Sequence, residues 1–282
     1  MNVSRIAIIG VGTMGTGIAQ VAAQAGYRVS LCDTDNRLVE RGLQAIAANF
    51  DKSVALGKST AERKDRIMAR IQASELKGAA GSADLIVEAI PEKLLLKEAF
   101  FKTLAHYAQS HCIFASNTSS LSIARLAAAS GRPDRFLGMH FFNPPQQMKL
   151  LEIVVTDNTS QDTLAACRSV GEKMRKECIV VKDSPGFATS RLCVCLGLEA
   201  VRMLEQGVAC AEDIDRAMTL GYGHQMGPLR LTDLVGLDVR LATAEELYQQ
   251  LGSEAFKAPA LLRTMVDEGK LGKKSGEGFY KW

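Results

Sequence analysis

The chain has 282 residues, a net charge of +3, 47% hydrophobic side chains and 23% charged side chains. This composition is typical of a globular protein with one large domain or two ordinary ones, and without long basic runs we expect no nucleic-acid partner. No apolar stretch reaches the roughly 18 residues of a membrane-spanning helix, and we expect no leader peptide and no membrane partner. The seven cysteines follow no disulfide or metal-ligand spacing, which favours a cytoplasmic protein with buried, reduced thiols and no metal.

Short β-like runs alternate with helical patterns in the first part of the chain. Residues 13–26 carry one apolar face at helical spacing and end at Gly26. Residues 35–72 predict two further helices, broken near 55–60. Strands that alternate with helices are typical of βαβ units and a mostly parallel sheet. The expected strands are 5–10, 27–33, 83–90, 112–117, 135–142, 150–155 and 177–183.

The pattern changes after Asp183. A Ser-Pro-Gly sequence follows, and from there the pattern is helical, with glycine-rich loops between the segments. We therefore predict two domains: an α/β domain over residues 1–183, with a helical insertion after its second strand, and an all-α domain over residues 184–282.

A glycine-rich turn joins the first predicted strand to the first predicted helix. Residues 10–15 read G-x-G-x-x-G, and Asp33 ends the next predicted strand. In this context the pattern indicates a Rossmann-type dinucleotide-binding domain, because the glycines allow a tight turn beside the diphosphate and the acid accepts the ribose hydroxyls of NAD. Arg28 and Arg37 keep NADP open as an alternative. The residues expected to hold the cofactor here are Gly10, Gly12, Thr13, Met14, Gly15 and Asp33.

Four histidines are candidates for the base that hydride transfer from an alcohol requires. His106 and His111 fall on or after a helical run, and His224 falls in a loop of the helical domain, so we interpret these three as surface or structural residues. His140 ends a predicted strand, where ligand clefts form in open α/β sheets. Glu152 follows twelve residues later on the next strand. By position alone, a catalytic histidine and a hydrogen-bonded core histidine are equally good interpretations of His140.

The sequence resembles the 3-hydroxyacyl-CoA dehydrogenase family over essentially its whole length, especially the short bacterial 3-hydroxybutyryl-CoA dehydrogenases. Several long motifs appear in the family's order, so this resemblance is far more specific than the glycine pattern alone. The motifs are GVGTMGTGIAQ (10–20), SNTSSLSI (116–123), GMHFFNPP (138–145), MKLLEIV (148–154), DSPGF (183–187), GYGHQMGPLRLTDLVGLD (221–238) and LGKKSGEGFY (271–280).

The resemblance implies that His140 is the general acid/base and that Glu152 orients its imidazole. It also implies that Ser119 bonds the reacting oxygen and that Asn143 lies near the nicotinamide and the substrate, so that both residues contact cofactor and substrate. Taken alone, Ser119 is compatible with a helix cap, and Asn143 before a proline is compatible with a turn.

Three further residues match positions that touch the cofactor in the family, namely Glu92, Lys97 and Lys274. Taken alone, Glu92 and Lys97 are also compatible with a solvated pair on a helix. On the substrate side, the resemblance places Lys52 and Lys58 near the phosphates of coenzyme A, although both are compatible with plain surface residues.

Two positions depart from the family pattern. Leu56 stands where close relatives often carry lysine, and Ser190 replaces the asparagine of the family motif in PGFATSR. Asparagine and serine both donate hydrogen bonds, but the serine hydroxyl is shorter. Three interpretations stay open: Ser190 keeps a catalytic role, the substrate differs, or activity is reduced.

The leading hypothesis from this resemblance is an enzyme of fatty acid metabolism that interconverts (3S)-3-hydroxyacyl-CoA, such as 3-hydroxybutyryl-CoA, and 3-ketoacyl-CoA. Its cofactor would be NAD, its partner an acyl-CoA, and its assembly a homodimer through the all-α domain, which would also help to bind substrate. The alternatives are a dehydrogenase of a non-thioester 3-hydroxy acid, as in gulonate or carnitine relatives, and a non-catalytic NAD-binding protein like the crystallin relative.

Overall fold

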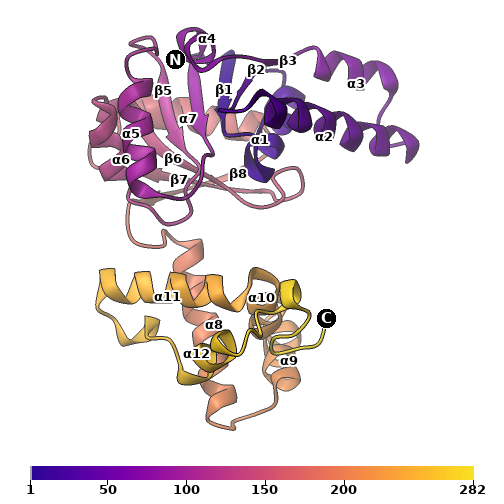
Figure 1. Ribbon diagram of the computed structural model, residues 1–282, viewed down its shortest axis with the longest axis vertical. Coiled ribbons are helices and arrows are strands. Elements are labelled where there is room, and N and C mark those ends of the chain that lie inside the picture. Colours follow the sequence, from indigo (N-terminus) through magenta and orange to yellow (C-terminus); the bar gives the residue numbers. More distant parts are fainter. Residues whose placement is uncertain (1) are drawn as a thin grey trace. The chain divides into compact units, whose positions relative to one another are not determined.

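The computed structural model describes residues 2–282 as two compact units, which divide in the chain between Ser184 and Pro185. The first unit consists of a sheet with helices, and the second is helical (Figure 1). The fold class predicted from the sequence, a mostly parallel α/β unit followed by an all-α unit, is confirmed. Among the described residues, no helix combines the length and the apolar character needed to cross a membrane.

An eight-stranded sheet, in the order β3-β2-β1-β4-β5-β6-β7-β8, forms the centre of the first unit. The strands are β1 (Arg5–Ile9), β2 (Arg28–Cys32), β3 (Ile71–Ala73), β4 (Leu85–Glu88), β5 (Ile113–Ser116), β6 (Phe136–Phe141), β7 (Leu150–Val155) and β8 (Glu177–Lys182). Neighbouring strands run parallel except β6 and β7, which are antiparallel. The parallel strands place their carboxyl ends at one edge, where open α/β sheets bind ligands.

Helices cover both faces of this sheet. They are α1 (Thr13–Gln24), α2 (Asn36–Ala55), α3 (Ala61–Met68), α4 (Leu76–Ser82), α5 (Leu94–Leu104), α6 (Ile123–Ser130) and α7 (Gln161–Lys173), with a 3-10 turn η1 (Pro133–Arg135). Alternate strand residues point to opposite faces, so Leu137 and Met139 of β6 join the core that α1, α2 and α7 cover. On the other face, Phe101 of α5 contacts the rings of Phe114 and Phe136. His140 shares this second face with Phe136 by alternation.

Two local expectations for the first unit are wrong. Residues 71–72, predicted as the end of a helix, belong to β3, in which only Ile71 is buried. Helix α6 begins at Ile123, and its cap is Ser122, whose hydroxyl accepts a hydrogen bond from the N–H of Arg125 (3.3 Å). A capping role for Ser119 is therefore excluded.

All seven cysteines are free thiols, but they are not uniformly buried as the sequence suggested. Burial raises the pKa of Cys32 to about 11 and that of Cys112 to about 12, so both thiols stay protonated near neutral pH. The remaining cysteines are Cys167, which is buried, Cys178, Cys193 and Cys195, which are half-buried, and Cys210, which is exposed.

The second unit is built from helices around its own apolar core. They are α8 (Thr189–Glu205), α9 (Ala211–Gly221), α10 (Pro228–Val235), α11 (Leu237–Leu251) and α12 (Ala260–Asp267), with 3-10 turns η2 (Glu254–Phe256) and η3 (Lys273–Ser275). The fully buried Asp233 holds the C-terminal tail, because its carboxylate accepts hydrogen bonds from the N–H groups of Phe279 (2.8 Å) and Tyr280 (2.9 Å) and from Trp282 Nε1 (2.9 Å).

Candidate active site

His140 and Glu152 form a buried pair on adjacent strands. They face each other directly in the antiparallel register of β6 and β7, an arrangement that brings side chains on one face into contact. His140 Nδ1 lies 2.8 Å from Glu152 Oε2, and both side chains are buried. A carboxylate at Nδ1 holds the neutral imidazole with its proton on that nitrogen, and in this tautomer Nε2 is the basic nitrogen.

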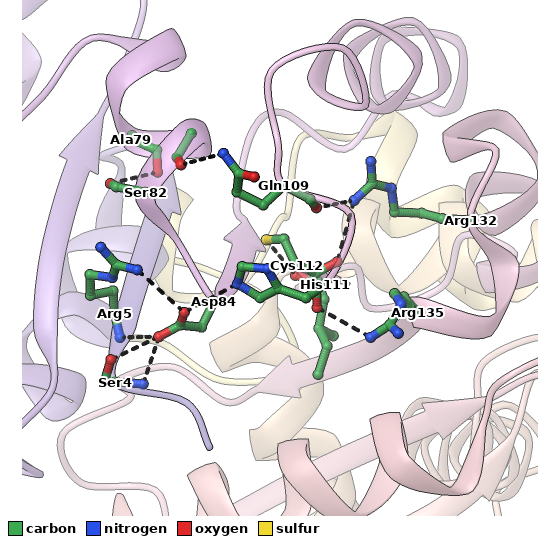
Figure 2. Close-up of polar contacts among 12 residues, drawn as sticks. Ser4, Arg5, Ala79, Ser82, Asp84, Gln109, His111, Cys112, Arg132 and Arg135 are labelled. Carbon is green, nitrogen blue, oxygen red and sulfur yellow. Dashed lines mark hydrogen bonds and ion pairs between the residues drawn. The ribbon is translucent and has the colours of Figure 1, made fainter. Parts of the chain in front are cut away.

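A second histidine–carboxylate pair lies at the amino ends of β1, β4 and β5, and Figure 2 shows its contacts. Asp84 accepts hydrogen bonds from the N–H groups of Ser4 and Arg5 and from the Ser4 hydroxyl, each at 2.9 Å. His111 Nε2 lies 3.4 Å from Asp84 Oδ1. Burial opposes the charged form of Asp84, but these hydrogen bonds outweigh it and lower its pKa. The pair ties strand ends together, away from the ligand-binding edge. The other two histidines, His106 and His224, are exposed.

The glycine turn before α1 has the close packing that its sequence predicts. Gly10 has φ +95°, and a Cβ on Gly15 would overlap the carbonyl oxygen of Gly10, so these positions require glycine. A Cβ on Gly12 would meet nothing within 4 Å, so the outer side of the turn is open. Thr13 and Met14 begin the helix, and no side chain caps its first N–H groups. An open turn with free N–H groups fits a dinucleotide diphosphate.

Asp33 follows β2 directly and is fixed beside this turn. Its Oδ2 accepts a hydrogen bond from the N–H of Val11 (2.7 Å), and its Oδ1 accepts one from the N–H of Thr34 (2.7 Å). The half-buried carboxylate has lone pairs left for ribose hydroxyls. The turn and the acid together therefore fit NAD.

Glu92 and Lys97 belong to one network with Glu88. Lys97 Nζ lies 2.5 Å from Glu88 Oε1 and 3.1 Å from Glu92 Oε2, and only 1% of the lysine side chain is exposed. The interpretation as a solvated helix pair is therefore wrong. Glu92 Oε1 accepts hydrogen bonds from the hydroxyl of Thr118 (2.5 Å) and from the N–H of Ser119 (2.9 Å). The network thus fixes the backbone at Ser119.

Glu88, which the sequence did not single out, anchors this network at the carboxyl end of β4. Its Oε2 accepts a hydrogen bond from the hydroxyl of Ser116 (2.6 Å), its register partner on β5. Burial raises the pKa of Glu88, although Lys97 and the hydrogen bonds oppose this shift. The only signal in the sequence was an acid at the end of an apolar strand.

The loop after β6 carries Asn143, which is exposed. The side chain of Asn117, at the end of β5, accepts a hydrogen bond from the N–H of Phe141 (2.9 Å), which ties β5 to the end of β6. The residues that follow His140 therefore start from a fixed point at the carboxyl edge of the sheet.

A groove of about 660 Å³ opens beside the glycine turn, between α1, α2 and the loop of residues 144–147. Arg41 and Asn49 of α2 line it. Lys52 and Lys58, the expected contacts of coenzyme A, are exposed and are not among the lining residues. A ligand-binding role for Arg41 could not be predicted from the sequence, because a single basic residue on a helix is usually a solvated surface residue.

Two of the expected site residues lie in the second unit. Ser190 is half-buried in the first turn of α8. Lys274 lies in η3, and its Nζ is 2.5 Å from Asp238 Oδ1. Among residues 2–282, no group of three or more His, Cys, Asp or Glu side chains is placed to hold a metal ion.

Comparisons with known proteins cover both units. The model of the 3-hydroxyacyl-CoA dehydrogenase NAD binding domain matches residues 5–184, and that of the C-terminal domain matches residues 186–282. A probable 3-hydroxybutyryl-CoA dehydrogenase of Bacillus subtilis is 41% identical, over 100% of this chain and 98% of that protein. The human mitochondrial hydroxyacyl-coenzyme A dehydrogenase is 41% identical, over 99% of this chain and 91% of that protein. The structure of (S)-3-hydroxybutyryl-CoA dehydrogenase from Ralstonia eutropha is similar with a TM-score of 0.96 and 38% identity, over 100% of this chain and 99% of that chain.

Proposed function

The chain belongs to the 3-hydroxyacyl-CoA dehydrogenase family, and we propose that it catalyses the reversible, NAD-dependent oxidation of (3S)-3-hydroxyacyl-CoA to 3-ketoacyl-CoA. The observation that carries this proposal is the buried pair of His140 and Glu152 at 2.8 Å. NAD is the cofactor and supplies the hydride acceptor when bound. The names of the relatives support a short-chain substrate such as 3-hydroxybutyryl-CoA.

The dyad performs the proton chemistry. In the oxidative direction, Nε2 of His140 takes the proton of the 3-hydroxyl group, and Glu152 stabilises the imidazolium that forms. The hydroxyl of Ser119 donates a hydrogen bond to the reacting oxygen, and Glu92 fixes the backbone that carries this serine. Asn143, on the loop after β6, contacts the substrate and the nicotinamide.

The glycine turn forms part of the wall of the groove, since Val11, Gly12 and Thr13 line it, so the two ligands would lie next to each other. The glycine turn and Asp33 hold NAD together with Glu92, and the buried Lys97 acts on the cofactor only by fixing Glu92. The groove lined by Arg41 and Asn49 receives the nucleotide part of coenzyme A, with Lys52 and Lys58 near its phosphates. A guanidinium and an amide are suitable donors for such groups.

The activity is tested by following NADH consumption with acetoacetyl-CoA and with free acetoacetate. We expect turnover with the thioester and little with the free acid. Turnover of the free acid alone would favour the non-thioester alternative, and tight NADH binding without any turnover would favour a non-catalytic protein.

The dyad is tested with two substitutions. His140→Ala removes the base, and Glu152→Gln keeps the shape while removing the charge that sets the tautomer. We expect kcat to fall by about 10²-fold to 10⁴-fold in each, with NADH affinity, measured by fluorescence titration, unchanged. A His140→Ala variant that keeps near-normal kcat would contradict the mechanism.

We also propose that the protein is cytoplasmic and forms a homodimer through its second unit. The support for the dimer is the large number of exposed apolar side chains on α8 to α11, since apolar surface of this kind is often covered in an oligomer.

A further inference from the structure

A second hollow, of about 330 Å³, lies on the other side of the loop that follows β6. It shares Gln146 and Gln147 of that loop with the groove beside the glycine turn, and Val21 and Gln24 of α1 also line it. We call it the basic hollow, because five of its lining residues are cations: Arg63, Lys149, Lys173, Arg175 and Lys176.

These cations lack acidic partners. Within residues 2–282, none of the five forms an ion pair, and neither Asp nor Glu lines the hollow. Lys173 Nζ lies over the ring of Tyr27, 4.3 Å from its centre, but the other four like charges repel each other, and a bound anion would remove this repulsion. The arrangement therefore favours an anionic ligand over a neutral one.

Lys176 is the buried member of the cluster. It is 7% exposed, and its Nζ donates hydrogen bonds to the carbonyl oxygens of Pro145 (2.5 Å) and Met148 (2.7 Å). An ammonium group has three N–H donors, so one remains for a ligand. Burial lowers the pKa of Lys176, and an anion beside it would stabilise its charged form.

Arg175 occupies a backbone position that suits glycine. It follows the C-cap of α7 with φ +60°. The N–H of Arg175 donates a hydrogen bond to the carbonyl oxygen of Glu172 (2.8 Å), and the N–H of Lys176 donates one to the carbonyl oxygen of Gly171 (2.9 Å). This is a Schellman motif, in which glycine is the usual residue at the left-handed position. An arginine there strains the backbone, and such outliers cluster at functional sites.

We propose that the basic hollow is a binding site for a phosphate-bearing anion of two or more negative charges, such as a diphosphate group. Guanidinium and ammonium groups match phosphate oxygens in charge and hydrogen bonding. None of the lining residues is aromatic, so the site offers no stacking surface for a base. The phosphate is either free in solution or part of the acyl-CoA substrate, and this second possibility rests on the proposed function.

The binding test uses inorganic pyrophosphate with the NADH-saturated protein, so that the glycine turn is already occupied. Thermal unfolding is followed at an ionic strength of about 0.15 M, for the wild type, Arg175→Gly, Lys149→Gln and the control Lys77→Gln. Lys77 is exposed on α4 and does not line the hollow. Arg175→Gly relieves the backbone strain, so it removes the guanidinium without a loss of folding.

We expect pyrophosphate to raise the melting temperature of the wild type and of Lys77→Gln in a saturable way. Arg175→Gly and Lys149→Gln should each bind it roughly tenfold more weakly, with Arg175→Gly melting no lower than the wild type in buffer. The absence of stabilisation in the wild type, or equal binding by all four proteins, would overturn the proposal.

The source of the phosphate is decided by kinetics with acetoacetyl-CoA and with the phosphate-free acetoacetyl-N-acetylcysteamine. If Arg175→Gly raises KM for the CoA thioester alone, the hollow binds phosphates of the substrate. If both KM values stay unchanged while pyrophosphate binding is weakened, it binds a free anion. The melting experiment requires no turnover, so it stands even if the proposed reaction fails.

Discussion

Lys97 is buried in the structure, although its place in the sequence is typical of an exposed residue. Five positions separate it from Glu92 in a charged stretch, which is also the pattern of a solvated helix. The structure instead buries it between Glu92 and Glu88. The partner that explains this burial, Glu88, lies on a strand, so no helical spacing relates the two residues.

Replacing Lys97 by methionine should destabilise the first unit. The change leaves Glu88 buried without its cation, and breaking a buried pair in this way costs about 3–5 kcal/mol. The double variant Glu88→Gln/Lys97→Met should recover part of that loss, because no unpaired charge remains. Urea unfolding of the two variants and the wild type measures both effects. Equal stability of Lys97→Met and the wild type would show that the pair contributes nothing net.

Ser190 stands where the family resemblance expects asparagine, and we predict that its hydroxyl keeps the hydrogen-bonding role. Ser190→Ala should then lower kcat/KM by roughly 10-fold to 100-fold, while Ser190→Asn should stay close to the wild type. The melting temperatures of both variants serve as the folding control. Full activity of Ser190→Ala would show that the residue at this position takes no part in catalysis.

At the scale of elements, the alternation of strands and helices was predictable because the central strands of the sheet are buried on both faces. Strands such as β4 and β5 are buried at every position and are apolar except for Glu88 and Ser116 at their carboxyl ends. β3 is different, since it has three residues and exposes two of them at the edge of the sheet. It is a strand because it pairs with β2, and a pairing between distant segments leaves no local pattern.

The amino ends of β1 and β4 are joined by Asp84, and this junction should make stability depend on pH. The folded-state pKa of Asp84 is lowered, so its contribution is present above the unfolded pKa of about 3.9 and is lost as the pH falls through the folded value. Asp84→Asn should cost about 1–3 kcal/mol at pH 7, because the donors of Ser4 and Arg5 then face a neutral amide oxygen in place of a charged carboxylate.

Urea unfolding at several pH values tests this prediction. The difference in unfolding free energy between the wild type and Asp84→Asn should be constant above about pH 5 and shrink below about pH 4. A difference that stays constant into the acid range would show that the carboxylate charge is not what stabilises the junction.

At the scale of the whole molecule, the candidate site combines segments that are far apart in the sequence. The candidate residues could be identified from the sequence because the order of the motifs matched that of a family. The register of β6 and β7 places His140 opposite Glu152. The motifs did not reveal the groove beside the glycine turn or the basic hollow. The groove depends on how α1, α2 and the loop after β6 pack, and the basic hollow on how that loop packs with α1, α3 and the end of α7.

The exposed apolar side chains of the second unit bear on the oligomeric state of the protein. About a third of the chain lies in the second unit, yet it carries half of the large apolar side chains that are exposed among the described residues. Leu220 and Tyr222, at the end of α9, are 77% and 79% exposed. Such a surface is expected to be covered, and two-fold dimers are the commonest assembly.

We therefore predict that the wild type is a dimer at micromolar concentration and that Leu220→Glu/Tyr222→Glu is a monomer. Burying these two side chains contributes about 3 kcal/mol or more, so the double change should weaken dimerisation by over about 100-fold. Leu95→Glu is the matched control, because Leu95 is 76% exposed on α5 of the first unit. Light scattering measures the mass of each protein. A wild type of monomer mass, or a double variant that stays dimeric, would place the interface elsewhere or exclude it.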